Sequence, residues 1–182
     1  MKKNNLSLKA LTLIISIQLG AGTVNKSPAD PREYNTFFLK NGIEVITVSD
    51  PELATSAATL SVGVGAFQDP EGAQGIAHFL EHMIFMGSKK YKSPNEYMEF
   101  ISQNGGSTNA FTAAEQTTYL FSINSKQFAP ALDRLSSAIK APLFDGTMVE
   151  KEINAVNSEW LKNRQTDGFI QQRTLALTGN PS

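Results

Sequence analysis

Cysteine is absent from the 182 residues of this sequence, which excludes disulfide bridges and thiolate metal sites. Histidine is scarce, because the chain contains only two, and any transition metal must therefore be held by these imidazoles and by carboxylates. An excess of charge of one sign is also lacking. The net charge of −1 gives no reason to expect a nucleic-acid partner or an anionic membrane surface.

A long hydrophobic run is missing too. The mostly apolar stretch Ala10–Leu19 is too short to cross a bilayer comfortably, so no stable membrane span is expected. Lysines precede this stretch, and a small-residue segment ending at Gly22 follows it. This order is typical of a secretory signal peptide, so we predict that residues 1–22 direct export, with the periplasm as the destination. A retained membrane anchor and a disordered start are the alternatives.

Strand patterns occupy three parts of the chain. Two β-branched and aromatic runs flank Asn41-Gly42, which predicts a hairpin over residues 36–49 after a flexible lead-in at 23–35. Residues 55–66 alternate like a strand, and two glycines near its end indicate close backbone packing. Residues 107–124 are rich in Thr, Tyr and Phe and predict one further strand.

Helical patterns are predicted at residues 75–85, 94–104, 127–140 and 148–164. The first helix is apolar on almost every side, so it is expected to be buried. Capping boxes, Ser93 with Glu96 and Thr147 with Glu150, mark the starts of the second and fourth helices. The order β-β-β-α-α-β-α-α predicts an α+β fold in which helices cover an antiparallel sheet.

Both histidines lie in one stretch of the first helix, His78-Phe79-Leu80-Glu81-His82. Positions four residues apart lie one turn apart on the same side of a helix, so the two imidazoles can converge on one ion. Glu81 borders that face, where a carboxylate can take a proton from metal-activated water. The alternative is a pair of hydrogen-bonded core histidines beside a surface glutamate. The metal reading is favoured because burying these polar groups without a partner costs several kcal/mol.

A catalytic zinc ion usually has three protein ligands and an open position, so a third ligand is needed. The last predicted helix offers Glu150, Glu152 and Glu159. Glu152 and Glu159 are seven residues apart, two turns along one face, so one can bind the ion while the other orients a histidine. Helical periodicity alone leaves open which glutamate does which. Two solvated surface glutamates are the alternative.

Three segments together resemble the pitrilysin and insulin-degrading enzyme family of zinc metallopeptidases. Residues 75–88 contain the inverted zinc motif His-x-x-Glu-His. Residues 109–112, Asn-Ala-Phe-Thr, resemble the family's substrate-binding edge strand, and residues 152–159 resemble its second metal helix. The resemblance runs from about residue 36 to the C-terminus. It implies a fold corresponding to the first, catalytic domain of a pitrilysin-like peptidase, incomplete at its C-terminus and spanning residues 36–182.

The resemblance also implies the roles of individual residues. His78, His82 and Glu159 would bind one Zn²⁺ ion, Glu81 would be the general base, and Glu152 would support a metal ligand. Asn109 and Ala110 would lie on an exposed strand edge, where an extended peptide can pair through its backbone. The implied function is a zinc-dependent endopeptidase that cleaves extended peptides or partly unfolded polypeptides.

The family plan continues with further homologous domains that close around the peptide. The expected partners are therefore peptide substrates and either the missing C-terminal domains or a complementing chain. A truncated or non-catalytic fragment that only binds peptide or a partner is one alternative, although inactive subunits of this family normally lack the zinc motif. A structural zinc site is another, but such sites usually have four protein ligands and are rich in cysteine.

Overall fold

The computed structural model describes residues 26–166, 168, 170, 171 and 174. The predicted signal peptide, residues 1–22, lies outside the described residues. Among those that are described, no helix is long and apolar enough to cross a membrane. The chain divides into two compact units, one up to Leu53 and one from Ala54 onward.

The first unit contains a β-hairpin. β1 (Glu33–Phe38) and β2 (Glu44–Ser49) pair antiparallel, with Phe38 opposite Glu44. Gly42 adopts a φ of 86°, a left-handed conformation that glycine reaches without steric cost, and the hairpin prediction around Asn41-Gly42 is confirmed. The strand begins three residues before the predicted start at residue 36, because the pairing continues to Glu33 opposite Ser49.

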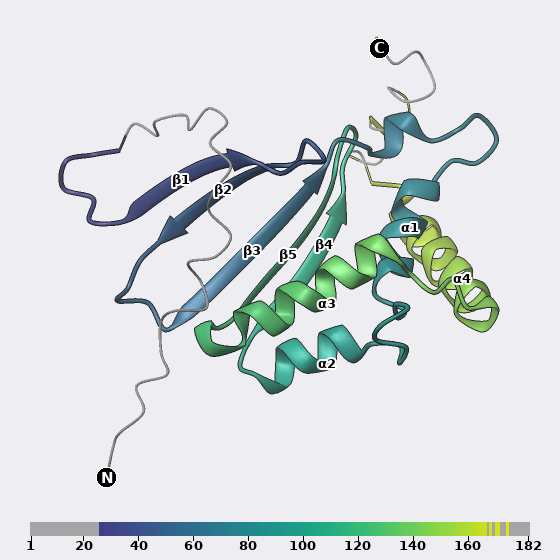
Figure 1. Cartoon of the computed structure of the whole chain (residues 1–182). Coiled ribbons are helices and arrows are strands. Elements are labelled where there is room, and N and C mark those ends of the chain that lie inside the picture. Colours follow the sequence, from purple (N-terminus) through teal and green to yellow (C-terminus); the bar gives the residue numbers. More distant parts are fainter. Residues whose placement is uncertain (1–25, 167, 169, 172–173, 175–182) are drawn as a thin grey trace. The chain divides into compact units, whose positions relative to one another are not determined.

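The second unit is an antiparallel sheet with helices packed against it (Figure 1). Its strands are β3 (Thr55–Val62), β4 (Ser107–Thr112) and β5 (Thr117–Asn124), in the order β3-β5-β4. The helices are α1 (Ile76–Ile84), α2 (Glu96–Gln103), α3 (Phe128–Lys140) and α4 (Gly146–Asn163). Single 3₁₀ turns, η1 (Ala66–Gln68) and η2 (Ser125–Gln127), complete it. The predicted α+β class is confirmed.

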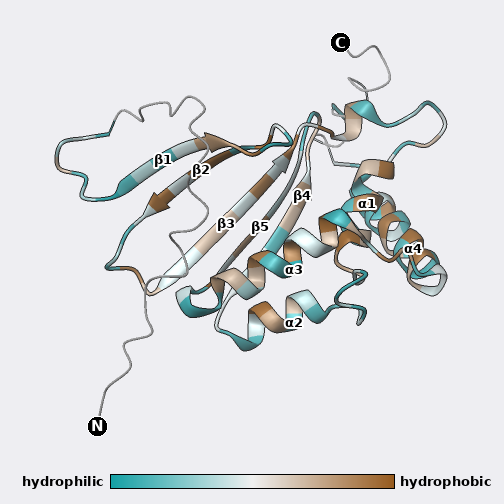
Figure 2. Ribbon diagram, viewed as in Figure 1, coloured by the Kyte–Doolittle hydropathy of each residue, from teal (hydrophilic) through white to brown (hydrophobic). Residues whose placement is uncertain are grey.

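The core of this unit lies between β5 and the helices α2 and α3. Alternate residues of β5 point into it, since period-2 alternation sends Tyr119, Phe121 and Ile123 to one face. On α2 and α3 the buried apolar residues recur every three to four positions, as helical periodicity requires, so each helix turns one apolar side to the core (Figure 2). The core cluster comprises Ile84, Phe85, Tyr97, Ile101, Tyr119, Phe121, Ile123, Ala131, Leu135 and Ala138.

The stretch 107–124 forms two strands, so the prediction of one strand is wrong. A hairpin turn at residues 113–116 separates β4 from β5. The turn contains neither Gly nor Pro, the residues that usually mark turns in a sequence. Its conformation depends on tertiary contacts instead: the carbonyls of Ala113 and Ala114 accept hydrogen bonds from the N–H groups of Ala66 and Phe67.

Gly65 explains why the chain can pass so close to this turn. A Cβ atom on Gly65 would lie 2.4 Å from the carbonyl oxygen of Ala113, whereas one on Gly63 would meet nothing within 4 Å. The predicted close packing is therefore confirmed at Gly65 and absent at Gly63.

Neither predicted capping box forms. α2 begins at Glu96, after Asn95 in a left-handed conformation, and the Glu96 carboxylate is bonded to Arg134 of α3. α4 begins one residue before Thr147, and its N-cap is Asp145, whose carboxylate accepts from the N–H groups of Thr147 and Met148. In α2, Arg134 takes the Glu96 side chain that the box would use. In α4, Asp145 takes the backbone N–H groups at the start of the helix.

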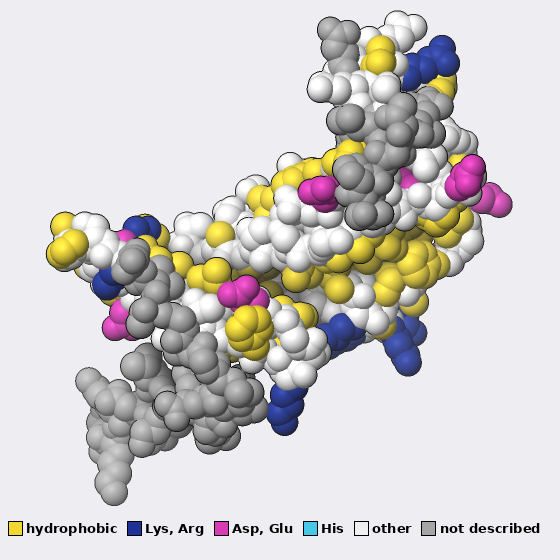
Figure 3. Space-filling view, turned by 90° about the horizontal axis from the view of Figure 1, so that it is seen from above, with side chains coloured by type: hydrophobic (Ala, Val, Ile, Leu, Met, Phe, Trp, Pro, Cys, Tyr) yellow, Lys and Arg dark blue, Asp and Glu magenta, His cyan; other side chains and the backbone are white. Residues whose placement is uncertain are grey.

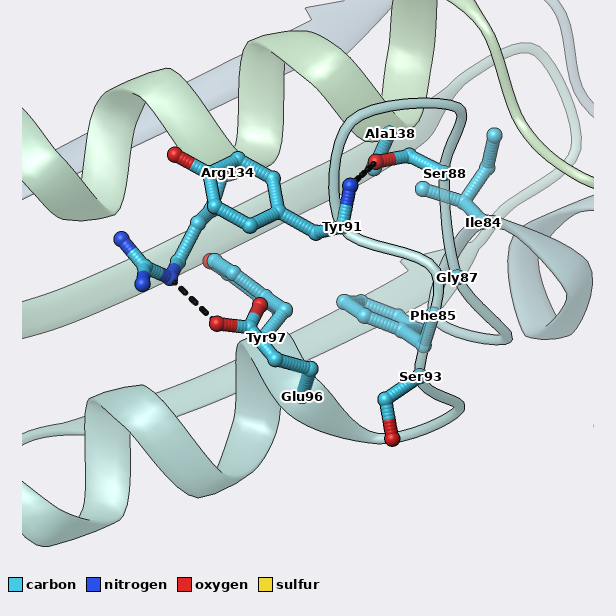
Figure 4. A pocket seen from close by; sticks show the side chains of 10 residues that line it. All are labelled: Ile84, Phe85, Gly87, Ser88, Tyr91, Ser93, Glu96, Tyr97, Arg134 and Ala138. Carbon is cyan, nitrogen blue, oxygen red and sulfur yellow. Dashed lines mark hydrogen bonds and ion pairs between the residues drawn. The ribbon is translucent and has the colours of Figure 1, made fainter.

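Arg134 also ties the loop between α1 and α2 to α3 (Figure 4). Its guanidinium donates to Glu96 at 2.9 Å and lies 3.7 Å from the ring centroid of Phe100 and 4.5 Å from that of Tyr91. A planar cation between two aromatic rings combines cation–π attraction with packing. A small cavity lies beside it, lined by residues that include Phe85 at the end of α1. The loop that follows α1 is thus anchored to two other helices.

The expected burial of α1 is only half right. Ala77, Glu81, Met83 and Ile84 are buried, but Ile76 and Leu80 on another side are exposed. An apolar pattern all around a helix predicts burial only if neighbours cover every side, and the described elements leave the side with Ile76 and Leu80 uncovered. Further hydrophobic side chains, including Ile153 and Leu161 of α4, are also exposed, and Figure 3 shows such side chains (yellow) over wide areas of one view.

Candidate metal centre

The two histidines of α1 point their outer ring nitrogens at the same place. His78 and His82 lie one turn apart, and their Nε2 atoms are 3.2 Å from each other. Their ring centroids are 4.8 Å apart, with the ring planes nearly perpendicular. The sequence prediction that the i and i+4 imidazoles converge is therefore confirmed as geometry.

Glu159 of α4 completes this cluster. Its Oε2 lies 3.4 Å from His78 Nε2 and 3.8 Å from His82 Nε2. Zinc bonds of about 2.0–2.1 Å in tetrahedral geometry separate the ligand atoms by about 3.3 Å, so these three spacings fit one ion. Within the described part of the chain, this is the group of residues whose ligand atoms lie close enough to hold a metal.

Glu152 lies behind His82 and fixes which of its nitrogens carries a proton. The Oε2 atom of Glu152 is 3.0 Å from His82 Nδ1, and the Glu152 side chain is only 7% exposed. An ionised carboxylate can only accept, so Nδ1 donates and the Nε2 lone pair is left facing Glu159 and His78. A histidine that binds a metal is commonly held in this way by a carboxylate.

Asp69 stabilises the start of the helix that carries both histidines. Its carboxylate accepts from the N–H of Gly75 at 2.6 Å and from that of Ala77 at 2.9 Å. These are first-turn N–H groups that have no partner inside the helix, and the negative charge suits the positive end of the helix dipole. The sequence prediction missed this cap because Asp69 lies outside the usual capping position.

Glu81 faces away from solvent and contacts the sheet. It is 8% exposed, and the hydroxyl of Thr112, the last residue of β4, donates to its Oε2 at 2.6 Å. Burial raises the pKa of nearby Tyr119 to about 12, and the negative charge of Glu81 adds to the rise. The sequence prediction included Glu81 but missed Thr112, which strand alternation places on the same face as Ala110.

The predicted substrate residues lie on β4, which pairs with β5 on one side and has no strand on its other side among the described residues. Asn109 is exposed, whereas Ala110 faces the helices and packs against the core cluster. Glu150, the remaining glutamate considered for the metal, is exposed and does not belong to the cluster. The roles of all these residues stay predictions.

Comparison with known proteins gives one consistent result. Residues 44–181 match the family described as "Insulinase (Peptidase family M16)". The chain is 44% identical over 158 residues to insulin-degrading enzyme of Homo sapiens and 42% identical over 160 residues to protease 3 of Escherichia coli (strain K12). It is 44% identical over 151 residues to "Insulin-degrading enzyme-like 1, peroxisomal" of Arabidopsis thaliana.

Each alignment covers most of this chain but little of the relative. The shares of this chain are 87%, 88% and 83%, and the shares of the relatives are 16%, 17% and 16%, in the same order. A crystal structure of pitrilysin superposes with a TM-score of 0.76 at 42% identity, covering 83% of this chain and 16% of that one. Because the family match spans most of the sequence and the fold agrees, the chain belongs to peptidase family M16, the insulinase family.

Proposed function

We propose that this chain carries the metal site and general base of a zinc-dependent endopeptidase. The observation that carries the proposal is the convergence of His78 Nε2, His82 Nε2 and Glu159 Oε2 within 4.8 Å of one another. Two imidazoles and one carboxylate are a frequent ligand set for catalytic zinc, with a fourth position open to water or substrate. Family membership supports the same assignment.

The residues of the chain divide the work between binding and proton transfer. His78, His82 and Glu159 would hold the ion, and Glu152 would keep His82 in the tautomer that offers Nε2. When bound, zinc supplies Lewis acidity, which lowers the pKa of water to about 7 and polarises a carbonyl oxygen. Glu81 would take the proton of the attacking water and return it to the leaving amine.

The substrate would be an extended segment of peptide. In the part of the chain that the structure describes, no strand pairs with the outer side of β4, and a peptide can add there as a further strand. Pairing at Asn109 and Ala110 would use the backbone, since Ala110 turns its side chain into the core. Only an extended chain can bind in this way, which favours peptides and partly unfolded polypeptides.

The proposal includes a compartment, the periplasm. The relative from Arabidopsis thaliana carries "peroxisomal" in its name, so family membership does not fix the compartment. The basic and apolar start of residues 1–22 supports export to the periplasm. N-terminal sequencing of the mature protein would check cleavage after Gly22.

The chain spans 16% of the length of human insulin-degrading enzyme, so further domains or a complementing chain would supply the rest of the substrate chamber.

The central test is the substitution Glu81→Gln. We expect the variant to keep one zinc per chain, because Glu81 is not a ligand, and to lose turnover of a quenched peptide by about 100-fold or more, since a general base contributes about 10²–10⁴-fold. Zinc content is measured by metal analysis and cleavage by fluorescence. Glu99→Gln, an exposed glutamate on α2, is the matched control and should behave as wild type.

Two results would contradict the proposal. One is unchanged turnover in Glu81→Gln, which removes the base from the reaction. The other is failure of the folded wild-type chain to bind zinc. A chain that binds zinc and peptide but does not cleave the peptide when loaded with zinc would instead be a peptide-binding module.

A further inference from the structure

We propose that Thr112 is the positioning residue that holds Glu81 in its working orientation; this inference rests on the proposed peptidase function. The two residues come from different elements, Thr112 from the end of β4 and Glu81 from α1. Their side chains meet at 2.6 Å between Thr112 Oγ1 and Glu81 Oε2. The sheet is thereby joined to the residue that would transfer the proton.

The direction of this hydrogen bond follows from the chemistry of the two groups. An ionised carboxylate accepts only, so the hydroxyl of Thr112 donates. A distance of 2.6 Å is typical of the strong bond between a hydroxyl and a charged carboxylate. Thr117, which faces Thr112 across the pair β4–β5, donates its hydroxyl to the carbonyl of Val64 at 2.9 Å, and its Oγ1 lies 3.5 Å from Thr112 Oγ1. The contact of Thr112 with Glu81 is much shorter, so the Thr112 hydroxyl donates to the carboxylate.

A threonine in a strand is well suited to this task. Its branched Cβ restricts rotation about χ1, and the pairing of Thr112 with Thr117 fixes its backbone. Glutamate, in contrast, has three rotatable side-chain bonds and many orientations to choose from. A bond to Oε2 from a rigid donor restricts the positions that the carboxylate can take and leaves Oε1 to accept the proton from water.

Orientation matters because proton transfer needs close contact. A general base must lie within about 2.6–3.2 Å of its proton, and a misplacement of about 1 Å can cost about 100-fold in rate. Thr112 also ends the strand that carries Asn109 and Ala110. Thr112 thus holds the base in a fixed position relative to the same strand on which the peptide is proposed to pair.

The experiment compares substitutions in the zinc-loaded protein with a quenched peptide. Thr112→Val keeps the shape and removes the hydroxyl, and Thr112→Ser restores the hydroxyl. We expect kcat of Thr112→Val to fall about 10- to 100-fold with KM and zinc affinity within about twofold of wild type. Thr112→Ser should keep most of the rate. Thr118→Val, which removes a buried hydroxyl bonded to Ser61 on β3, is the matched control and should keep kcat.

A structural readout needs no turnover. In a crystal structure of zinc-loaded Thr112→Val, the Glu81 carboxylate should occupy a different rotamer or more than one, while His78 and His82 stay in place. If Thr112→Val proves unstable, Thr112→Ala provides a second variant without the hydroxyl for both measurements.

The failures of the two proposals are distinguishable. Wild-type kcat and an unmoved Glu81 in Thr112→Val would overturn the positioning role while Glu81→Gln remained inactive. A loss of zinc affinity or an equal loss in Thr112→Ser would also overturn it, because the effect would then be a general disturbance of β4. Full activity of Glu81→Gln would instead overturn the proposed function itself.

Discussion

Glu152 and Glu159, on the same helix, make different contacts with the histidines. Glu152 is buried, contacts His82 Nδ1 at 3.0 Å and is absent from the cluster of ligand atoms. Glu159, two turns further along α4, is 48% exposed and faces the two Nε2 atoms. The pair that helical periodicity could not tell apart thus differs in burial and in the nitrogen it meets.

At this scale we predict that Glu152→Gln weakens zinc binding about tenfold, because loss of an outer carboxylate typically costs about 10–100-fold in metal affinity and the amide oxygen can still accept from Nδ1. The dissociation constant is measured by competition with a zinc-binding dye. Glu150→Gln, on the exposed side of the same helix, is the control and should bind like wild type. Equal affinities for all three proteins would contradict the supporting role of Glu152.

Among the elements, α4 shows how a helix start is decided. The sequence favours a capping box at Thr147 and Glu150, but the carboxylate of Asp145 binds the N–H groups of Thr147 and Met148. Asp is as good an N-cap as Thr or better, and its charge adds a favourable interaction with the helix dipole. The start of α4 matters for the site because the helix carries both Glu152 and Glu159.

The corresponding prediction is that Asp145→Ala lowers the free energy of unfolding by about 0.5–2 kcal/mol, the usual effect of losing an N-cap. Thr147→Ala is the matched control, since its hydroxyl would be the cap only if the sequence-based box formed, and it should cost less. Urea unfolding followed by circular dichroism measures both. A larger loss of unfolding free energy in Thr147→Ala than in Asp145→Ala would instead favour the capping box predicted from the sequence.

At the scale of the whole molecule, a metal would join two helices that are far apart in sequence. His82 on α1 and Glu159 on α4 are 77 residues apart, and α1 and α4 pack together. A ligand that binds the folded state but not the unfolded one stabilises it by mass action. A metal bound there would therefore link metal binding to the stability of the second unit.

We accordingly expect zinc to raise the thermal midpoint and a chelator to reverse the rise. At a zinc concentration of about 100 times Kd, the stabilisation is about 2.7 kcal/mol. Glu159→Gln should lose most of this shift, because it removes the ligand contributed by α4. Scanning calorimetry with and without zinc provides the measurement, and identical midpoints under both conditions would argue against a site that spans the two helices.

The sequence by itself indicated the class of the fold and the residues that could hold a metal ion. Two histidines at i and i+4 with Glu81 between them placed the candidate imidazole ligands on one helix, and apolar periodicity identified most helices and strands. These features depend on neighbours within one or two turns or on the alternation of a strand, so local rules capture them.

Only the tertiary structure decided the contacts between distant segments. The turn at 113–116, the cap from Asp69 and the bond from Thr112 to Glu81 each join residues from different elements. The family resemblance implied different roles for Glu152 and Glu159, but only the structure shows that they differ in burial and in the histidine nitrogens that they meet. Such contacts depend on how elements pack in three dimensions, and the spacing of residues along one element contains no information about the neighbour it will meet.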